Sequence, residues 1–445
     1  MSPNNTITSG SYHVTVDGRG QATLNSANGS IVLDFVLTSS THGLVTEFDN
    51  NGTGSGTLDL QPAAVAQTAL AGSYSFGLSG VGSSASYATV GSITLDASGT
   101  ATGGIEDINN GGTATTNQAI STSSTILVGS GTAPGTAHIA AGAGTSFAFD
   151  VYAIDSTHFK LVETDGLLFI SGDAFTQGAS IPSGQFVYTM AGSNNSNPVN
   201  GAVPLFSGGY FTNTSGAVTA GIEDFNDGGT VSATSVTGIT GSITALTGGR
   251  SQLSLTGFVN GAANDVPGNY TFAAYPFTAN GITGLQLMEI DGLGVTSGAA
   301  YAQTSTSLAA SQGYGLNLTG FNSNGEEDDI AEFTLTSTSF SGIVDLNDQS
   351  LAFLSETLTF DKSFTGSLPS AVDSNGRGTA TTNYFNYDFY VVNSNTFIFL
   401  EVDNSQVGLG VFEQQSTPAA GGAAQPVASV LHPVMAPHAA FRRKR

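Results

Sequence analysis

Apolar and polar side chains alternate along much of this chain with a period of two residues. In the clearest run, one face of an extended segment carries Phe385, Tyr387, Phe389 and Val391. Alternation with this period is typical of a β-strand that buries one face. Turn clusters of two to four residues, such as 393–395, separate the runs, and links this short join antiparallel neighbours. The pattern therefore predicts an all-β protein built from antiparallel hairpins, with no amphipathic helix.

Three sequence markers recur in a fixed order. A block with the sequence Gly-Ile-Glu-Asp-Ile-Asn-Asn-Gly-Gly occupies residues 104–112, returns almost unchanged at 221–229 and returns in weaker form at 342–348. A Glu-x-Asp pair recurs at Glu47/Asp49, Glu163/Asp165, Glu289/Asp291 and Glu401/Asp403. A glutamine closes each unit, at Gln61, Gln177, Gln303 and Gln414. Ordered recurrence of this kind indicates a tandem array of one structural module.

The markers divide the chain into five parts. Residues 63–181 form module 1, residues 182–305 form module 2 and residues 306–415 form module 3, each long enough for a core of its own. Residues 1–62 match only the C-terminal half of a module, and we call them the half-module. Residues 416–445 are rich in Ala, Gly and Pro and end in four basic residues, which predicts a flexible tail with a basic end.

The half-module begins in the middle of the repeat. Its Gly18-Arg19-Gly20 parallels Gly376-Arg377-Gly378, and the residues that follow keep the same order of markers. We expect it to supply about four strands, which is half of a sheet. It should therefore be the least stable part of the folded body, and the chain should be a fragment of a longer protein.

Each full module holds about eight short strands by this pattern, and a meander of hairpins has to hide its two edges. Closure into a barrel and packing into a two-sheet sandwich both do so. The short consecutive hairpins favour an up-and-down barrel over a sandwich.

Composition narrows the class of function. Charged residues make up only 9% of the chain, and Ser, Thr, Asn and Gly must take the exposed positions that helices usually give to Glu, Lys and Arg. Residues 1–415 carry all 33 acidic residues and only five cations, so the body would repel nucleic acid. Zero cysteines exclude a disulfide framework, and no apolar run is long enough for a transmembrane helix. The composition resembles that of secreted or cell-surface proteins of bacteria.

The recurrent block admits two readings. Glu106-Asp107-x-Asn109-x-Gly111, its copy at Glu223-Asp224-x-Asn226-Asp227-Gly228 and the remnant Asp345-x-Asn347-Asp348 all resemble calcium loops of oxygen ligands. The same residues also suit a hairpin turn, in which Asp and Asn bond their own backbone and Gly takes a positive φ. No distal Glu sits where a calcium loop needs one. We therefore expect ordinary hairpin turns, with calcium binding as the alternative.

The Glu-x-Asp pairs share strand parity with apolar residues, so a regular strand would point Glu163, Glu289 and Glu401 inward near the rim of each module. A buried carboxylate needs a partner, and an arginine guanidinium is well suited to the role. The recurrent Gly-Arg motif suggests that Arg19, Arg250 and Arg377 pair with Glu47, Glu289 and Glu401. Module 1 has Pro134 at this position, so Glu163 would need backbone donors, water or Lys160 instead.

Nothing in the sequence assembles an active site. The six histidines, at positions 13, 42, 138, 158, 432 and 438, occupy no matching repeat positions and have no zinc-type spacing. No nucleophile elbow and no phosphate loop occurs. We expect no catalytic, cofactor-binding or metal-ligating residues, and no enzyme activity.

The repeated Glu-Asp block, the Gly-Arg-Gly motif and the closing glutamines together resemble those of uncharacterised Gly/Thr-rich tandem-repeat β proteins predicted to be exported by bacteria. This resemblance spans residues 10–415 and implies no activity. The leading expectation is a structural or adhesive repeat array, with cell-surface or matrix components as possible partners. The alternative is a set of small-ligand binding β-barrels. Cores filled by Phe and Tyr favour the array, whereas an apolar cavity in each module favours the binder.

Overall fold

The computed structural model describes residues 6–416 except 62–63, 83–84, 131–132, 143, 195–202, 233, 260–266, 280, 311, 324 and 351–354. The basic tail therefore lies outside the described residues. The chain falls into two compact units, which we describe one at a time. The first unit combines Met1–Leu60 and Gly228–Ser232 with Gln303–His432, and the second combines Gln61–Asp227 with Ala233–Ala302. The half-module thus folds with module 3, and module 1 folds with module 2.

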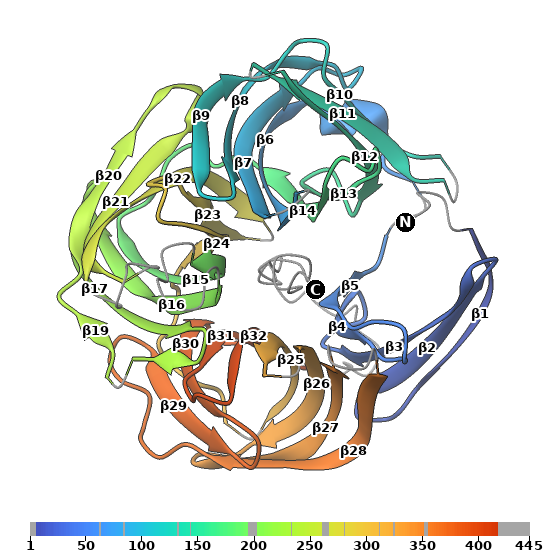
Figure 1. The fold of residues 1–445 in the computed structure, drawn as a ribbon, viewed down its shortest axis with the longest axis vertical. Coiled ribbons are helices and arrows are strands. Elements are labelled where there is room, and N and C mark those ends of the chain that lie inside the picture. The colour runs from blue at the N-terminus through green and yellow to red at the C-terminus, as the bar shows by residue number, and fades with distance from the viewer. Residues whose placement is uncertain are drawn as a thin grey trace. The chain divides into compact units, whose positions relative to one another are not determined.

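In the first unit, the half-module is an open antiparallel sheet of five strands in chain order (Figure 1). This is one strand more than the sequence suggested, because the exposed segment before Gly18 also pairs. The strands are β1 (Ile7–Val14), β2 (Arg19–Ser26), β3 (Gly29–Leu37), β4 (His42–Glu47) and β5 (Ser55–Asp59).

Module 3, in the same unit, is a closed barrel of eight antiparallel strands in simple up-and-down order, with β32 paired to β25. The predicted barrel is therefore confirmed for this module. Its strands are β25 (Gln312–Asn322), β26 (Glu326–Leu335), β27 (Ser339–Ser350), β28 (Ser355–Ser367), β29 (Arg377–Thr382), β30 (Asn386–Asn393), β31 (Thr396–Glu401) and β32 (Gln406–Gln414).

Module 2, in the second unit, is a barrel of the same type, because β16 pairs with β15 and β17, and β24 pairs back to β15. Two short strands and a 3₁₀ turn interrupt the meander. The elements are β15 (Gly184–Asn194), β16 (Val203–Thr214), β17 (Ala217–Asp227), β18 (Thr230–Val231), β19 (Val236–Thr237), β20 (Thr240–Ala245), η2 (Thr247–Gly249), β21 (Ser251–Phe258), β22 (Gly268–Ala279), β23 (Ile282–Glu289) and β24 (Gly294–Ala302).

Module 1 is an open sheet of nine antiparallel strands. The segments near its two edges are joined by isolated bridges between Thr100 and Thr125 and between Ile120 and Ala141. The elements are η1 (Gln67–Leu70), β6 (Gly72–Val81), β7 (Ser86–Leu95), β8 (Ala101–Asn110), β9 (Thr113–Ala119), β10 (Thr125–Leu127), β11 (Gly135–Ala141), β12 (Thr145–Ala153), β13 (His158–Glu163) and β14 (Phe169–Thr176). No helix in the described part of the chain is long and apolar enough to cross a membrane.

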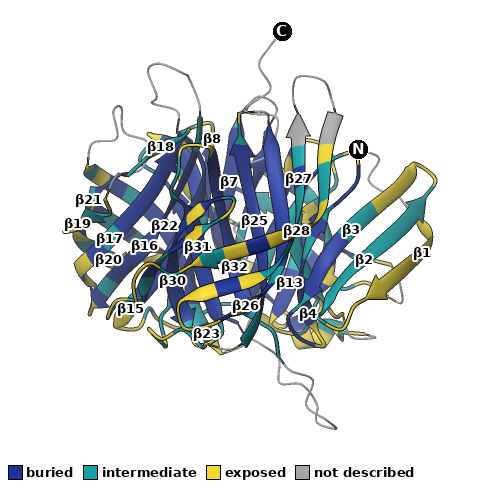
Figure 2. Cartoon of the chain, turned by 90° about the horizontal axis from the view of Figure 1, so that it is seen from below, coloured by how far each residue is buried: buried dark blue, intermediate teal, exposed yellow. Residues whose placement is uncertain are grey.

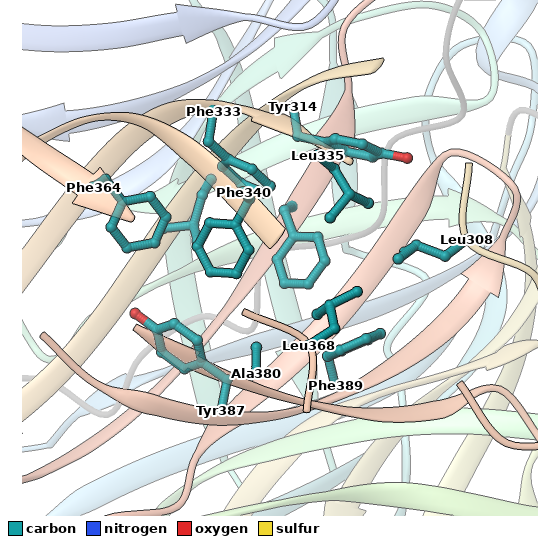
Figure 3. A pocket seen from close by; sticks show the side chains of 12 residues that line it. Leu308, Tyr314, Phe333, Leu335, Phe340, Phe364, Leu368, Ala380, Tyr387 and Phe389 are labelled. Carbon is teal, nitrogen blue, oxygen red and sulfur yellow. The ribbon is translucent and has the colours of Figure 1, made fainter. Parts of the chain in front are cut away.

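The interiors of the two closed barrels are filled by aromatic and aliphatic side chains. In module 3, Tyr314, Phe333, Phe397 and Phe412 pack against one another in stacked and edge-to-face pairs with ring centroids 5.2–6.5 Å apart. The cavity that remains among them is about 20 Å³ (Figure 3), which has room for one water molecule. The corresponding apolar site in module 2 has no free volume.

The half-module has the strand register of the second part of module 3. Arg19 pairs with Val36 as Arg377 pairs with Tyr390. Leu33 pairs with Glu47 as Tyr387 pairs with Glu401. Strands β1 to β5 are therefore the counterparts of β28 to β32, and the half-module lacks counterparts of β25 to β27.

Candidate functional site

The recurrent Glu-Asp block lies on the third strand of each module, which is β8, β17 or β27. The hairpin-turn reading is wrong for its acidic residues: Glu106 and Asp107 are buried strand residues. Asn109 is buried in the same strand, but its side chain does bond the backbone of the turn, as that reading expected. Only Gly111 and Gly112 form the turn, and their φ values of 60° and 87° explain why glycine is needed there. Glu223, Asp224, Asn226 and Asp227 are likewise buried in β17.

Alternate residues of β8 face opposite sides of the sheet. Ile108 belongs to the core of module 1, so Glu106 shares its inward face and donors on β7 can reach it: the Thr89 hydroxyl donates to Glu106 Oε1 at 2.7 Å. Burial raises the pKa of Glu106 to about 7, although the Thr89 hydrogen bond opposes the shift. Asp107 and Asn109 take the other face, where module 2 covers them.

Asp107 makes a buried ion pair with module 2. The Arg250 Nε donates to Asp107 Oδ2 at 2.6 Å, and the Tyr275 hydroxyl donates to the same oxygen at 2.6 Å. The other carboxylate oxygen accepts the backbone N–H of Asn117 at 2.8 Å. The side chain of Asp107 is 0% exposed and that of Arg250 is 7% exposed, so the pair is removed from water and fully hydrogen-bonded at the carboxylate.

Asn109 fastens β8 to the β23–β24 turn of module 2. Its Nδ2 donates to the carbonyl oxygens of Glu289 and Gly294 at 2.8 and 2.9 Å. Its Oδ1 accepts the N–H of Gly112 at 3.0 Å, which ties the side chain to its own hairpin. Both Nδ2 donors and the Oδ1 acceptor of this buried amide therefore have partners.

An apolar patch completes the contact. Ala88 and Val90 on the outer face of β7 form one buried cluster with Ala273, Tyr275, Met288 and Val295 of module 2. The patch excludes water from the neighbouring ion pair. Modules 1 and 2 are therefore joined by a dry patch with a polar network beside it.

The first unit repeats this arrangement between module 3 and the half-module. Asn347, the counterpart of Asn109, donates through Nδ2 to the carbonyl oxygens of Glu47 and Gly52 at 2.8 and 3.2 Å. Arg19, the counterpart of Arg250, places Nη1 2.8 Å from Asp361 Oδ1 and 4.0 Å from Asp345 Oδ2. Module 3 thus holds the half-module as module 1 holds module 2, with a looser and more exposed ion pair.

Two further polar contacts strengthen the half-module interface. Asp328 on β26 accepts hydrogen bonds from the hydroxyls of Thr53 and Ser55 at 2.6 and 2.7 Å. His42 lies between two carboxylates, with Nδ1 2.6 Å from Asp59 Oδ1 and Nε2 3.2 Å from Glu413 Oε2. Burial of the imidazole works to lower the pKa of His42, but the two carboxylates outweigh it and raise that pKa to about 10.

Each closing glutamine donates its side-chain amide to backbone carbonyl oxygens at an equivalent position of a different segment. Gln303 Nε2 donates to the carbonyl oxygens of Asn375 and Val391 at 2.9 and 2.7 Å. In the half-module, the matching carbonyls belong to Asp17 and Leu37, and the residue that binds them is Gln415 rather than Gln414. Gln61 does the same at Ala153, at 3.1 Å. The predicted marker was therefore one residue too early in module 3.

The Glu-x-Asp pairs are structural, and the predicted arginine partner is wrong. Glu289 and Glu401 are buried, as the strand parity indicated. Arg250, however, pairs with Asp107, and the hydroxyl of Thr296 donates to Glu289 Oε2 at 2.9 Å. The arginine reaches out of its own module because its side chain lies on the outer face of the barrel wall. Arg377 forms its ion pair with Asp388.

The second residue of each pair shapes a turn. Asp291 accepts the N–H groups of Thr271 and Leu293 at 2.9 and 3.0 Å, and Asp49 accepts those of Val32 and Asn51 at 2.8 Å each. In module 1, where Pro134 replaces the arginine, Glu163 accepts the N–H of Leu167 at 3.3 Å. This is the backbone donor that the sequence reasoning allowed for, and Lys160 pairs with Asp173 instead.

Module 1 contains a cavity of about 580 Å³. Its lining combines the apolar or aromatic Tyr87, Ile108, Phe147 and Leu168 with the polar Asn110, Thr113, Thr115 and Thr145. Within the described residues, the hydroxyls of Tyr87 and Thr145 are buried and make no hydrogen bond. Burial, together with nearby Glu106, raises the pKa of Tyr87, so its phenol remains a donor at neutral pH.

Sequence reasoning missed that the block joins modules, together with the roles of Tyr275, Asp328 and His42. One signal was present: Asp107 and Asn109 have strand parity opposite to the core residue Ile108, so both point away from their own module. Within the described residues, no group of three or more His, Asp or Glu side chains is arranged to hold a metal ion.

Comparisons with known proteins add little. No family model matches the chain, and no curated protein matches it. Among solved structures, an AttH protein from Nitrosomonas europaea is similar at 7% identity and a TM-score of 0.18, over 54% of this chain and 94% of that one. Intact Ap-TbpB, with its N and C lobes, is similar at 10% identity and a TM-score of 0.17, over 86% of each chain.

Proposed function

We propose that this protein is a non-catalytic structural repeat array, secreted or displayed at a bacterial cell surface, in which β modules are fastened to one another by a repeated set of side-chain contacts. Its partners would be cell-surface or matrix components. The observation that carries the proposal is the recurrence of one docking arrangement in both units. The residues kept from repeat to repeat are those that join modules, as selection for a fixed mechanical arrangement would favour.

The filled interiors support the same proposal. Tyr314, Phe333 and Phe412 occupy the centre of the module 3 barrel, and comparable rings fill module 2. A barrel that stores a ligand keeps a cavity of several hundred cubic ångströms, far more than remains among the described core side chains of these two barrels. Their exposed Ser and Thr side chains suit a role as a spacer.

Calorimetry tests whether the contacts make modules 1 and 2 act as one body. The wild-type chain should unfold these modules in a single cooperative transition. Replacing Asp107 and Asn109 together by alanine should split that transition in two, because each module keeps its own core. The matched control replaces exposed Asn110 by alanine and should leave the transition whole. An unsplit transition in the double variant would contradict the proposal.

A second function is favoured by one observation, the cavity of module 1. Its lining includes the aromatic rings of Tyr87 and Phe147 and the unpaired hydroxyls of Tyr87 and Thr145. These groups suit a small neutral ligand that has an apolar face and hydrogen-bonding groups. Nile red serves as a neutral fluorescent probe of such a site. Ala85→Trp, at the cavity wall, should abolish its binding, whereas Ala119→Trp at an exposed position should not. Equal binding to both variants would remove module 1 from consideration.

A further inference from the structure

The half-module sheet is an incomplete barrel. Strands β1 to β5 repeat the register of β28 to β32, but module 3 closes its barrel by placing β25 to β27 between β32 and β28. In the half-module, β1 pairs with β2 and β5 pairs with β4. Among the described residues, neither strand has a strand partner on its other edge.

The face that would be the barrel interior is correspondingly exposed. Gly10 and Ser11 pair with Leu24 and Thr23 as Gly366 and Ser367 pair with Thr382 and Thr381, so the apolar residues that follow can be matched. Leu368 and Val372 pack against the module 3 core. Their counterparts Tyr12 and Val16 are exposed, Tyr12 to 78%.

Other positions on the inner face of the half-module sheet are also more exposed than their counterparts in module 3. Tyr387, Val391 and Phe399 are buried in module 3, whereas their counterparts Leu33, Leu37 and Val45 are only half-buried. All eight residues of β1 are exposed, and this strand appears as an exposed band at the margin of its sheet in Figure 2. Unpaired edges with apolar side chains are unfavourable in water and favour the addition of strands.

A segment that closes this sheet has a defined shape and chemistry. It must supply three antiparallel strands, the first to pair with β5 and the third to pair with β1. The inward residues must be aromatic or aliphatic to cover Leu33 and Val45. The opening strands of every module in this chain meet these requirements, as β25 to β27 do against β28 to β32.

We propose that the half-module is a docking site for a three-stranded polypeptide segment of the module-opening type, which completes it into an eight-stranded barrel by strand addition on both edges. The outer face of β3 to β5 is already occupied by module 3, so the incoming segment uses only the inner face and the two edges. This inference does not depend on the function proposed above.

A fusion tests the proposal in the full chain. A copy of residues 312–350 is placed ahead of Met1, so that residues 1–6 act as the connection to β1. A matched control carries the same segment with Ala331→Pro and Val344→Pro in the copy, because proline in a central strand prevents pairing. Hydrogen exchange is then followed in β1 and β5, with β30 and β31 as internal references.

We expect exchange in β1 and β5 to slow at least about tenfold in the fusion and to stay unchanged in the control, with the reference strands equal in both. Equal rates in the fusion and the control would overturn the proposal. So would slow exchange in β1 of the unfused chain that depends on protein concentration, since the edge would then be covered by a second copy.

Discussion

The Asp107 carboxylate of module 1 and the Arg250 guanidinium of module 2 lie 2.6 Å apart, and both side chains are buried. Their positions are 143 residues apart in the chain. Tyr275 donates to the same carboxylate oxygen, which leaves Asp107 with no unpaired oxygen. Removing one member of such a pair strands the other as a buried charge.

Arg250→Ala should therefore lower the free energy of unfolding by about 3–5 kcal/mol. The measurement is the urea-induced unfolding transition of the second unit. Asp107→Asn combined with Arg250→Gln should cost less than the sum of the two single changes, because no charge is left unpaired. Strictly additive losses would show that the two side chains do not interact.

Asn109→Ala should cost about 1–3 kcal/mol, since it leaves two buried carbonyl oxygens without their donor. Asn347→Ala should have a comparable effect in the first unit, because the contacts are equivalent. Asn110→Ala, next to Asn109 but exposed, serves as the control. If the control is as destabilising as Asn109→Ala, the cost reflects the hairpin and not the docking.

The attachment of the half-module to module 3 should weaken at alkaline pH. The pKa of His42 is raised to about 10 by Glu413 and Asp59 against the effect of burial. A raised histidine pKa stabilises the folded state fully below about pH 6.5 and loses this effect as the pH rises through the folded value. Limited proteolysis within residues 30–48 should accordingly accelerate between pH 7 and pH 10.

His42→Gln tests the assignment, because glutamine hydrogen-bonds without titrating. The variant should be cleaved faster than wild type at pH 6.5, and its cleavage should no longer depend on this pH range. A wild-type pH profile that persists in His42→Gln would show that another group is responsible.

Glu401→Gln should stabilise the protein at pH 8. Burial, followed by the neighbouring Asp403, raises the pKa of Glu401 to about 10. The folded state therefore favours the protonated acid, and stability that is complete below about pH 4.5 is lost as the pH rises. Glutamine mimics the neutral acid, so we expect a gain of at least about 1 kcal/mol at pH 8. The partly exposed Glu163, changed to glutamine, should gain less; an equal gain would contradict the argument from burial.

Amide exchange across β3 and β4 should be faster than across their counterparts β30 and β31. Leu33 and Val45 are half-buried where Tyr387 and Phe399 are fully buried, so local opening exposes less new apolar surface. Equal protection of the two regions would show that the half-module is as stable as a closed barrel.

The sequence was sufficient for the strands and their antiparallel order because both depend on neighbouring residues. Alternation such as Phe385 to Val391 defines a strand, and short turns define antiparallel neighbours. Barrel closure, which the sequence only favoured over a two-sheet sandwich, is found in modules 2 and 3. The open edge of module 1 could not be foreseen, since it depends on how Ile120 and Ala141 approach across the gap.

The docking site was harder to predict because its contacts join residues that are far apart in the sequence. Asp is as common in exposed turns as it would be in this buried block, so the residue type does not show that Asp107 is buried. Only packing against another module does so. We expected Arg250 to pair with Glu289 of the same module. Neighbouring positions on a barrel wall, however, alternate between inside and outside. The outward-facing Arg250 therefore pairs with a residue of a different module.

The contact between module 3 and residues 1–60 bears on how large an assembly of such chains can become. A polymer that grows by adding identical units needs a last unit whose binding face is vacant, and its length then follows concentration. Here residues 1–60 already occupy that face on module 3, through Asn347, Asp328 and Glu413. The contact is made within one chain, so its occupancy does not depend on protein concentration.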